Sequence, residues 1–261
     1  MSRAADRWRE IGPPLTVDPE TWRRGDVALA SVGILSDAPI VSLHVRQPGW
    51  YAAHANALNI RDAEIASYAP AVAYLADRGI RVIRLGDPSM TPAPGAMALF
   101  DYAHSPLKSD WMDVYIAARC RFHLGTASGM SFVPMLFGRP VLFTNYAPMD
   151  HALDPRSVVT LFKVHRDLRN AVVPLEALVA RHRHAASATD LEMLGAWLED
   201  NDDDDILDAV RFVDSHIDEA TGQLRFPDGT FAASDRDFAR AGFPKRPQVP
   251  PRFWDRRYRQ R

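Results

Sequence analysis

Backbone amides and hydroxyl groups gather in the run Gly125-Thr126-Ala127-Ser128-Gly129, the segment of this chain best suited to hold an anion. The run follows a short apolar stretch and precedes a helical pattern over residues 128–137, so it is expected to turn from a strand into a helix. The N-terminus of a helix leaves N–H groups unpaired and favours negative charge. The alternative is an ordinary capped helix start. The residues expected to line the anion site are Gly125, Thr126, Ser128, Gly129 and Met130.

A charged group follows the strand that is expected over residues 40–45. Arg46 carries a planar guanidinium fork that suits a phosphate or a carboxylate. His44 lies two residues before it, and the alternation of side chains along a strand predicts that both point to one face of the sheet. The alternative for Arg46 is an ion pair with Asp62 or Asp87 at the sheet margin.

Two aspartates begin another expected helix. Ser109 can act as its N-cap, and Asp110 and Asp113 share one face of its first turn, where the helix dipole favours carboxylates. A structural role is the default interpretation. The functional alternative is a hydrogen bond to a ribose or sugar hydroxyl.

Arg84 and Gly86 lie at the end of the strand expected over residues 80–85, in the same way as Arg46 follows the strand over residues 40–45. Arg84 can reach an anion, and Gly86 can let a nucleobase approach the backbone. The simpler interpretation is a strand-to-turn exit without a ligand. Elsewhere, neither the Gly-Lys-Ser/Thr ending of a P-loop nor a GxGxxG fingerprint occurs in the sequence.

Short apolar strands alternate with helices along most of the chain, which predicts an α/β fold with a Rossmann-like parallel sheet covered on both faces. Ligands of such sheets bind at the carboxyl ends of the strands, where the motifs above fall. Residues 39–217 are expected to form this binding domain. Residues 1–38 are then an extension or a linker remnant, and residues 218–261 a basic extension that packs back on the domain. Further strands are expected over residues 99–102, 121–124, 140–144 and 158–162, and helices over residues 19–31, 63–79, 175–186 and 203–217.

The overall composition excludes several classes of function. A formal net charge of −2 over 261 residues gives no general attraction to nucleic acid. The single cysteine, Cys120, excludes an internal disulfide and fits packing in a reducing compartment. No apolar run is long enough to span a bilayer and the N-terminus lacks a signal-peptide pattern, so a cytoplasmic protein is expected. Residues 202–205 are interpreted as a solvated helix start, and His182 and His184 point to different faces of a helix, so no metal site is expected.

The C-terminal extension interleaves basic and aromatic residues. We expect Phe253 and Trp254 to anchor it by packing. The alternative is a basic surface that contacts a polyanionic acceptor or, peripherally, a membrane.

The motifs together resemble known proteins. The segments HVR, GIRVIRLG and SDWMDVYIAARCRFHLGTASGMSFVPMLFGRPVLFTN resemble an uncharacterised bacterial family that is described as glycosyltransferases, and the similarity covers most of the chain. More distantly, the His-x-Arg and Gly-Thr-x-Ser segments are similar to GDP-fucose-dependent fucosyltransferases. The Ser-Gly turn is similar to the lipopolysaccharide heptosyltransferases. Both of these groups have the GT-B fold.

The resemblance implies that Arg46 binds the β-phosphate of a nucleotide sugar and that residues 126–128 also hold its diphosphate. The heptosyltransferase pattern is Asp-Ser-Gly, whereas this chain has Ala127 in place of the aspartate, so any direct role of that aspartate is lost. GT-B enzymes have two Rossmann-like domains, and the resemblance covers the second, donor-binding one. A separate acceptor-binding domain or partner protein is therefore expected.

The resemblance thus implies a glycosyltransferase, or its donor-binding half, in which Arg46 and the backbone amides neutralise the leaving diphosphate without a metal or another cofactor. His44 is the nearest candidate for a general base, and Asp113 is a candidate for shaping the pocket. One alternative is a nucleotide-sugar-binding module without turnover. Another is a nucleotide-sugar epimerase, which would require an acid and a base such as Asp110 and Asp113.

Overall fold

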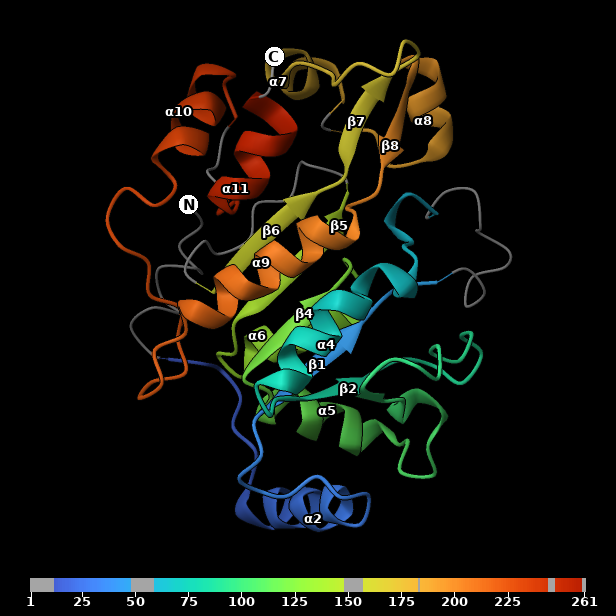
Figure 1. Ribbon diagram of the computed structural model, residues 1–261, viewed down its shortest axis with the longest axis vertical. Helices are drawn as coiled ribbons and strands as arrows, with labels where there is room; N and C mark the ends of the chain where they lie inside the picture. Colours follow the sequence, from blue (N-terminus) through green and yellow to red (C-terminus); the bar gives the residue numbers. More distant parts are fainter. Residues whose placement is uncertain (1–11, 48–58, 148–156, 183, 244–246, 260–261) are drawn as a thin grey trace.

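The computed structural model describes residues 12–47, 59–147, 157–182, 184–243 and 247–259. Its centre is a six-stranded sheet with the order β3-β2-β1-β4-β5-β6, in which every neighbouring pair is parallel (Figure 1). This is the strand order of the Rossmann fold, so the predicted Rossmann-like α/β sheet is confirmed. The strands are β1 (Ile40–His44), β2 (Arg81–Arg84), β3 (Leu99–Phe100), β4 (Phe122–Gly125), β5 (Val141–Tyr146) and β6 (Val158–Phe162).

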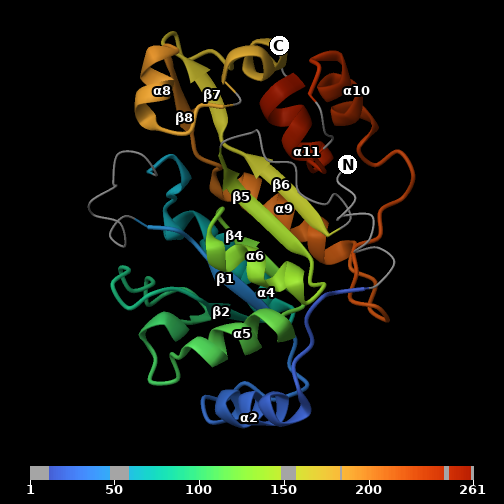
Figure 2. The same cartoon turned by 180° about the vertical axis from the view of Figure 1, so that it is seen from behind.

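Helices cover both faces of the sheet, as predicted. On one face lie α4 (Ala69–Asp77) and α9 (Asp203–Ser215), which contact each other. On the other face lie α5 (Asp110–Arg119) and α6 (Gly129–Leu136), which Figure 2 shows from the rear. Strands β1, β4 and β5 are therefore buried on both sides, which explains their nearly continuous apolar sequences.

Local signals set where the helices begin. Asp18 caps α2 (Pro19–Ala30) by accepting a hydrogen bond from the Thr21 N–H at 2.9 Å. Pro70 delays α4, because a proline suits only the first turn of a helix. The segment Ile65–Tyr68 therefore forms a 3-10 turn, and the α-helix begins at Ala69.

A small antiparallel sheet extends beyond β6 and was not predicted. It pairs β7 (Val164–Asp167) with β8 (Ala196–Glu199). Three of the four residues of β7 are ionisable, so the strand lacks the apolar alternation by which a strand is recognised. The helix predicted over residues 175–186 is confirmed only for residues 175–182 and is not a regular α-helix. A single α-helical turn, α7 (Leu175–Ala177), leads into a π-helical turn (Leu178–His182), and α8 (Ala188–Met193) follows.

The interpretation of residues 202–205 as a solvated helix start needs correction. Asp202 caps α9 as expected, and its carboxylate accepts from the Asp205 N–H at 2.8 Å. Asp205, however, is fully buried, because Arg256 and Arg257 of the C-terminal segment pair with its carboxylate. Among the described residues, no three or more His, Cys, Asp or Glu side chains are grouped so that they could hold a metal ion.

The main hydrophobic core lies between the sheet and the α4–α9 layer and includes the C-terminal segment. Phe253 and Trp254 of α11 (Pro251–Trp254) are buried in it, and Trp254 packs on Phe238 of α10 (Ala232–Arg240) with ring centroids 4.8 Å apart. Cys120 is buried in a second cluster under α5, and burial raises the pKa of its thiol to about 11, so it is a packing residue. Within the described ranges, no helix is long and apolar enough to cross a membrane.

Candidate functional site

The end of β1 meets the end of β4 at the point where the strand order of the sheet reverses. His44 stands opposite Gly125 in the register of these two strands. The Thr126 N–H donates to the His44 carbonyl at 3.0 Å, and the Arg46 N–H donates to the Thr126 hydroxyl at 2.9 Å. Because open parallel sheets bind ligands at this switch point, the two sequence motifs lie side by side where a ligand is expected.

Hydroxyl groups hold the turn after β4 in one conformation. Ser128 caps α6 as predicted, accepting from the Ser131 N–H at 3.3 Å, and its Oγ also lies 3.1 Å from His44 Nδ1. The Ser131 hydroxyl donates to the Thr126 carbonyl at 2.8 Å. The side-chain hydroxyls of Thr126 and Ser128 therefore serve first to fix the turn.

The backbone of this turn, in contrast, offers unused donors. The N–H groups of residues 127, 128, 129 and 130 donate to no oxygen atom within the described part of the chain. They lie at the N-terminus of α6, where the helix dipole adds positive potential. A Cβ placed on Gly129 would meet no atom within 4 Å, so the space before the helix is open. Successive free N–H groups at a helix start form an anion-binding site.

Arg46 lies beside this turn but has a carboxylate partner. The strand ends at His44, so the predicted alternation does not extend to Arg46, and its Nε pairs with Asp62 Oδ1 at 2.9 Å. Both side chains are less than one-fifth exposed. Burial raises the pKa of Asp62, and the charge of Arg46 opposes that rise. The alternative predicted from the sequence, an ion pair with Asp62, is therefore formed.

Lys163 is a second cation at this edge, and the sequence analysis missed it. It follows β6 directly, and its buried Nζ donates to the Asp62 carbonyl at 2.7 Å and pairs with Asp200 at 2.6 Å. A lysine immediately after a buried apolar strand was the available signal, because the carboxyl ends of parallel strands share one edge of the sheet.

His44 is uncharged at neutral pH. Burial, followed by the positive charges of Arg84 and Arg46, lowers the pKa of its imidazole from 6.5 to about 4. It therefore contributes a hydrogen-bonding group next to Ser128 and no positive charge.

The candidates after β2 serve the neighbouring loop. Arg84 is fully buried, pairs with Asp101 at 3.0 Å and donates to the Thr91 carbonyl at 2.8 Å. Gly86 has a φ of +156°, and a Cβ on it would lie 2.4 Å from Met90 Sδ. These contacts account for both residues by packing, in agreement with the simpler interpretation of this strand exit.

The acidic start of α5 lies next to α6. The helix begins at Asp110 as predicted, but the Ser109 side chain makes no capping bond and its hydroxyl donates to the Leu107 carbonyl at 3.3 Å. Asp113 pairs with Lys108 at 2.7 Å, whereas Asp110 is exposed. Met130, in the first turn of α6, packs against the cluster under α5 and so connects the two helix starts.

Loss of the Ser128 cap should be measurable. Ser128→Ala is expected to lower the free energy of unfolding by about 1 kcal/mol, because the Ser131 N–H loses its side-chain acceptor and keeps only the Ser128 carbonyl at 3.1 Å. Ser109→Ala is the matched control: it occupies the same position of α5 without a capping bond and should cost less than about 0.5 kcal/mol. Urea denaturation of the two variants measures the difference, and equal costs would contradict the capping role.

The strand order defines a Rossmann-like α/β fold. No protein-family model matches the chain, and no curated protein matches its sequence. Similar solved structures include a glycosyl transferase family 9 protein from Veillonella parvula, with 11% identity and a TM-score of 0.45 over 76% of this chain and 52% of that one. Two others are from E. coli. The ADP-heptose LPS heptosyltransferase II has 16% identity and a TM-score of 0.40, over 58% of this chain and 45% of that one. The heptosyltransferase WaaC, solved with ADP-2-deoxy-2-fluoro heptose, has 16% identity and a TM-score of 0.34, over 74% of this chain and 55% of that one. Each is a distant likeness, and the chain spans about half the length of these structures.

Proposed function

We propose that the chain binds the diphosphate of a nucleotide sugar at the start of α6 and is a glycosyltransferase or its donor-binding half. The observation that carries the proposal is the set of four consecutive N–H groups over residues 127–130 that donate to no described residue, placed at the switch point of a Rossmann-type sheet. The resemblance of the HVR and GTASG segments to glycosyltransferase motifs supports a nucleotide sugar as the source of that diphosphate.

The chemistry follows from the charge that develops when a sugar leaves its diphosphate. The N–H groups and the dipole of α6 are fixed before the ligand arrives, so they can stabilise the leaving phosphate without reorganising. Arg46 lies 2.9 Å from Asp62 and would exchange part of this ion pair for the β-phosphate. These groups neutralise the phosphate charge, so the proposed reaction requires no metal. The acceptor side of the reaction would come from a separate domain or partner.

The remaining candidates have supporting roles in this proposal. His44 is uncharged, orients Ser128 and is a weak base, with a pKa of about 4. Asp113 would accept from a hydroxyl of the sugar or ribose, in exchange for its contact with Lys108. A nucleotide-sugar epimerase is disfavoured because Asp113 is paired and Asp110 is exposed, so they are not an acid and base facing one substrate.

The backbone N–H of Gly129 allows a sharp test. Gly129→Pro removes this donor while keeping the helix, because Gly129 is its first residue and Ser128 already has the extended backbone that precedes proline (φ −145°, ψ 165°). Gly129→Ala keeps the donor, and its Cβ enters open space. We expect Gly129→Pro to weaken binding of ADP, GDP or UDP at least tenfold relative to Gly129→Ala, which is about 1.4 kcal/mol, measured by calorimetry.

Arg46 is tested in parallel. Arg46→Gln should reduce the thermal stabilisation by the same nucleotides, whereas Arg78→Gln, which breaks an ion pair with Asp214 far from the site, should not. If no nucleoside diphosphate stabilises the wild-type protein, the proposal fails. Hydrolysis of a nucleotide sugar by the purified chain would support a transferase, and binding without any turnover would support the binding module.

A further inference from the structure

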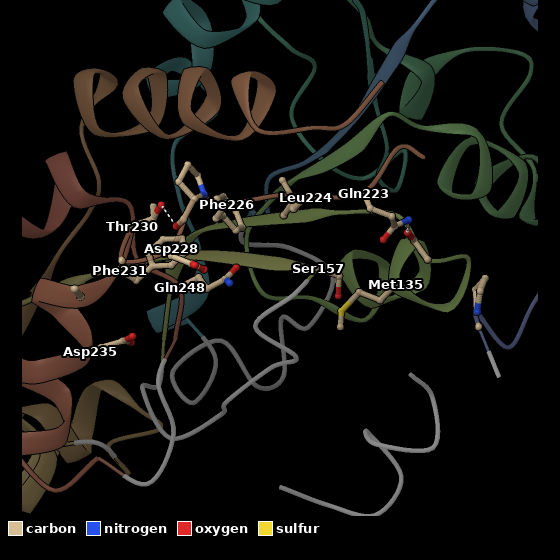
Figure 3. A pocket seen from close by; sticks show the side chains of 16 residues that line it. Met135, Ser157, Gln223, Leu224, Phe226, Asp228, Thr230, Phe231, Asp235 and Gln248 are labelled. Atoms are coloured by element: carbon tan, nitrogen blue, oxygen red, sulfur yellow. Dashed lines mark hydrogen bonds between the residues drawn. The ribbon is translucent and has the colours of Figure 1, made fainter. Parts of the chain in front are cut away.

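A cavity of about 690 Å³ lies beside β6, and Figure 3 shows the side chains that line it. It is bounded by the C-terminal end of α6 at Met135 and Gly138, by Ser157 before β6 and by the loop over residues 223–232. The proposed diphosphate site is at the other end of α6. An eight-residue helix is about 12 Å long, so the cavity is a separate location from that site.

The walls of the cavity are formed by contacts within the protein itself. Phe226 stacks on Phe212 with centroids 5.5 Å apart and meets Phe231 edge-on at 4.9 Å. The segment before Phe226 is held by a bridge between Ile217 and Leu224 and by a hydrogen bond from the Gln223 side chain to the Gly138 carbonyl at 2.8 Å. The cavity is therefore preformed, as ligand sites usually are.

Its polar groups are mainly acceptors. Gln248 Oε1 is a buried atom without a hydrogen-bond partner in the described part of the protein. The Asp228 carboxylate, on the exposed side, makes no hydrogen bond or ion pair with another described residue. The Thr230 hydroxyl already donates to the Pro227 carbonyl at 2.6 Å. A ligand that donates hydrogen bonds would satisfy Gln248, whose unmet bond otherwise costs free energy.

The charges of the lining residues indicate which hydrogen-bond-donating ligands fit the cavity. No lysine, arginine or histidine is among the described residues that line it, so a phosphate or a nucleotide would be unfavourable there. The acceptor at the buried position is an uncharged amide, which favours a neutral donor such as a hydroxyl, while the Asp228 carboxylate lies on the exposed side of the lining. An uncharged ligand with several hydroxyls and apolar C–H surfaces suits the combination of Gln248, Asp228 and the phenylalanine rings.

We infer that this cavity is a binding site for a neutral saccharide, distinct from the proposed donor site. The sugar's hydroxyls donate to Gln248 Oε1 and to the Asp228 carboxylate, and its C–H face packs on the aromatic wall. The inference does not depend on the proposed transferase activity, since the two sites are built from different residues.

Calorimetry on the full chain tests the inference with glucose, mannose, galactose, N-acetylglucosamine and maltotriose, and with spermidine and ADP as the charged comparisons. Saturable millimolar or tighter binding of at least one sugar is expected, and ADP should bind unchanged in variants of the cavity. Gln248→Leu and Asp228→Asn should each weaken the sugar at least tenfold. Gln248→Leu keeps the backbone bond from the Thr160 N–H to the Gln248 carbonyl at 2.8 Å, so the fold should be retained.

Asp37→Asn is the matched control, because it removes an exposed carboxylate in a turn remote from the cavity. Sugar binding in this variant should equal that of the wild type. The inference is overturned if none of the sugars binds, if spermidine alone binds, or if sugar binding is unaffected by both cavity substitutions.

Discussion

Asp205→Ala is expected to lower the free energy of unfolding by about 3 kcal/mol, the lower end of the range for breaking a buried charge pair by removing one partner. Asp205 is fully buried at the start of α9 and accepts from Arg257 Nε at 2.8 Å and from Arg256. The Arg257 side chain is only 11% exposed. Truncation of Asp205 therefore removes the buried carboxylate of this cluster, and Arg257 keeps only the more exposed carboxylates of Glu199, at 3.1 Å, and Asp202.

Urea denaturation at neutral pH measures this cost. Asp204→Ala is the control, because Asp204 is the adjacent residue in the same helical turn and is exposed; its replacement should cost less than about 1 kcal/mol. The double variant Asp205→Leu with Arg257→Met should be more stable than Asp205→Ala, since it removes the positive charge together with its partner. Equal effects of the two alanine substitutions would show that the buried pair is not what stabilises this end of the helix.

Acidification is expected to destabilise the protein by about 4 kcal/mol between pH 7 and pH 5, through the imidazoles of His44 and His123. Burial lowers the pKa of His123 to about 3, with a smaller contribution from His44, and the pKa of His44 itself is about 4. Both imidazoles stay neutral in the folded chain, whereas in the unfolded chain they take up protons below pH 6.5. Stability is therefore lost as the pH falls from about 6.5 toward these folded-state values.

His123 provides the variant for this test. Its Nδ1 lies 2.9 Å from the Ser42 hydroxyl, and its Nε2 is buried without a partner among the described residues. Unfolding free energies at pH 7, 6 and 5 should show about half the pH dependence in His123→Gln. His184→Gln, a substitution at an exposed position, is the control and should follow the wild type. A pH dependence that is the same in His123→Gln as in the wild type would contradict this origin.

Local sequence patterns predicted most of the central sheet. Apolar runs marked β1, β2, β4, β5 and β6 to within about two residues, because a strand buried on both faces is nearly continuously hydrophobic. Capping residues predicted the starts of two helices, α2 after Asp18 and α6 after Ser128. These features depend on neighbours within a few residues, which a sequence displays directly. The pairing of β7 with β8 escaped prediction because these strands carry polar residues and their paired residues lie 29 to 35 positions apart in the chain.

The candidate site was also predicted only in part. The turn over residues 125–129 and its place before a helix could be predicted, since N–H groups at a helix start are unpaired in any such turn. The partners of the cations could not be predicted. Arg46 pairs with Asp62, Arg84 pairs with Asp101, and Lys163 reaches the same edge from β6. Spacing along the chain does not tell which of several carboxylates a guanidinium will meet.

The sequence by itself determined a parallel α/β sheet and a turn at its carboxyl edge that leads into a helix, because both follow from periodicity and from the conformational preferences of adjacent residues. Only the tertiary structure decided which charged side chains form ion pairs and that Asp205 is buried against Arg257. It also formed the cavity beside β6 with its hydrogen-bond acceptors. These depend on contacts between distant segments, whose formation is governed by packing of the whole core.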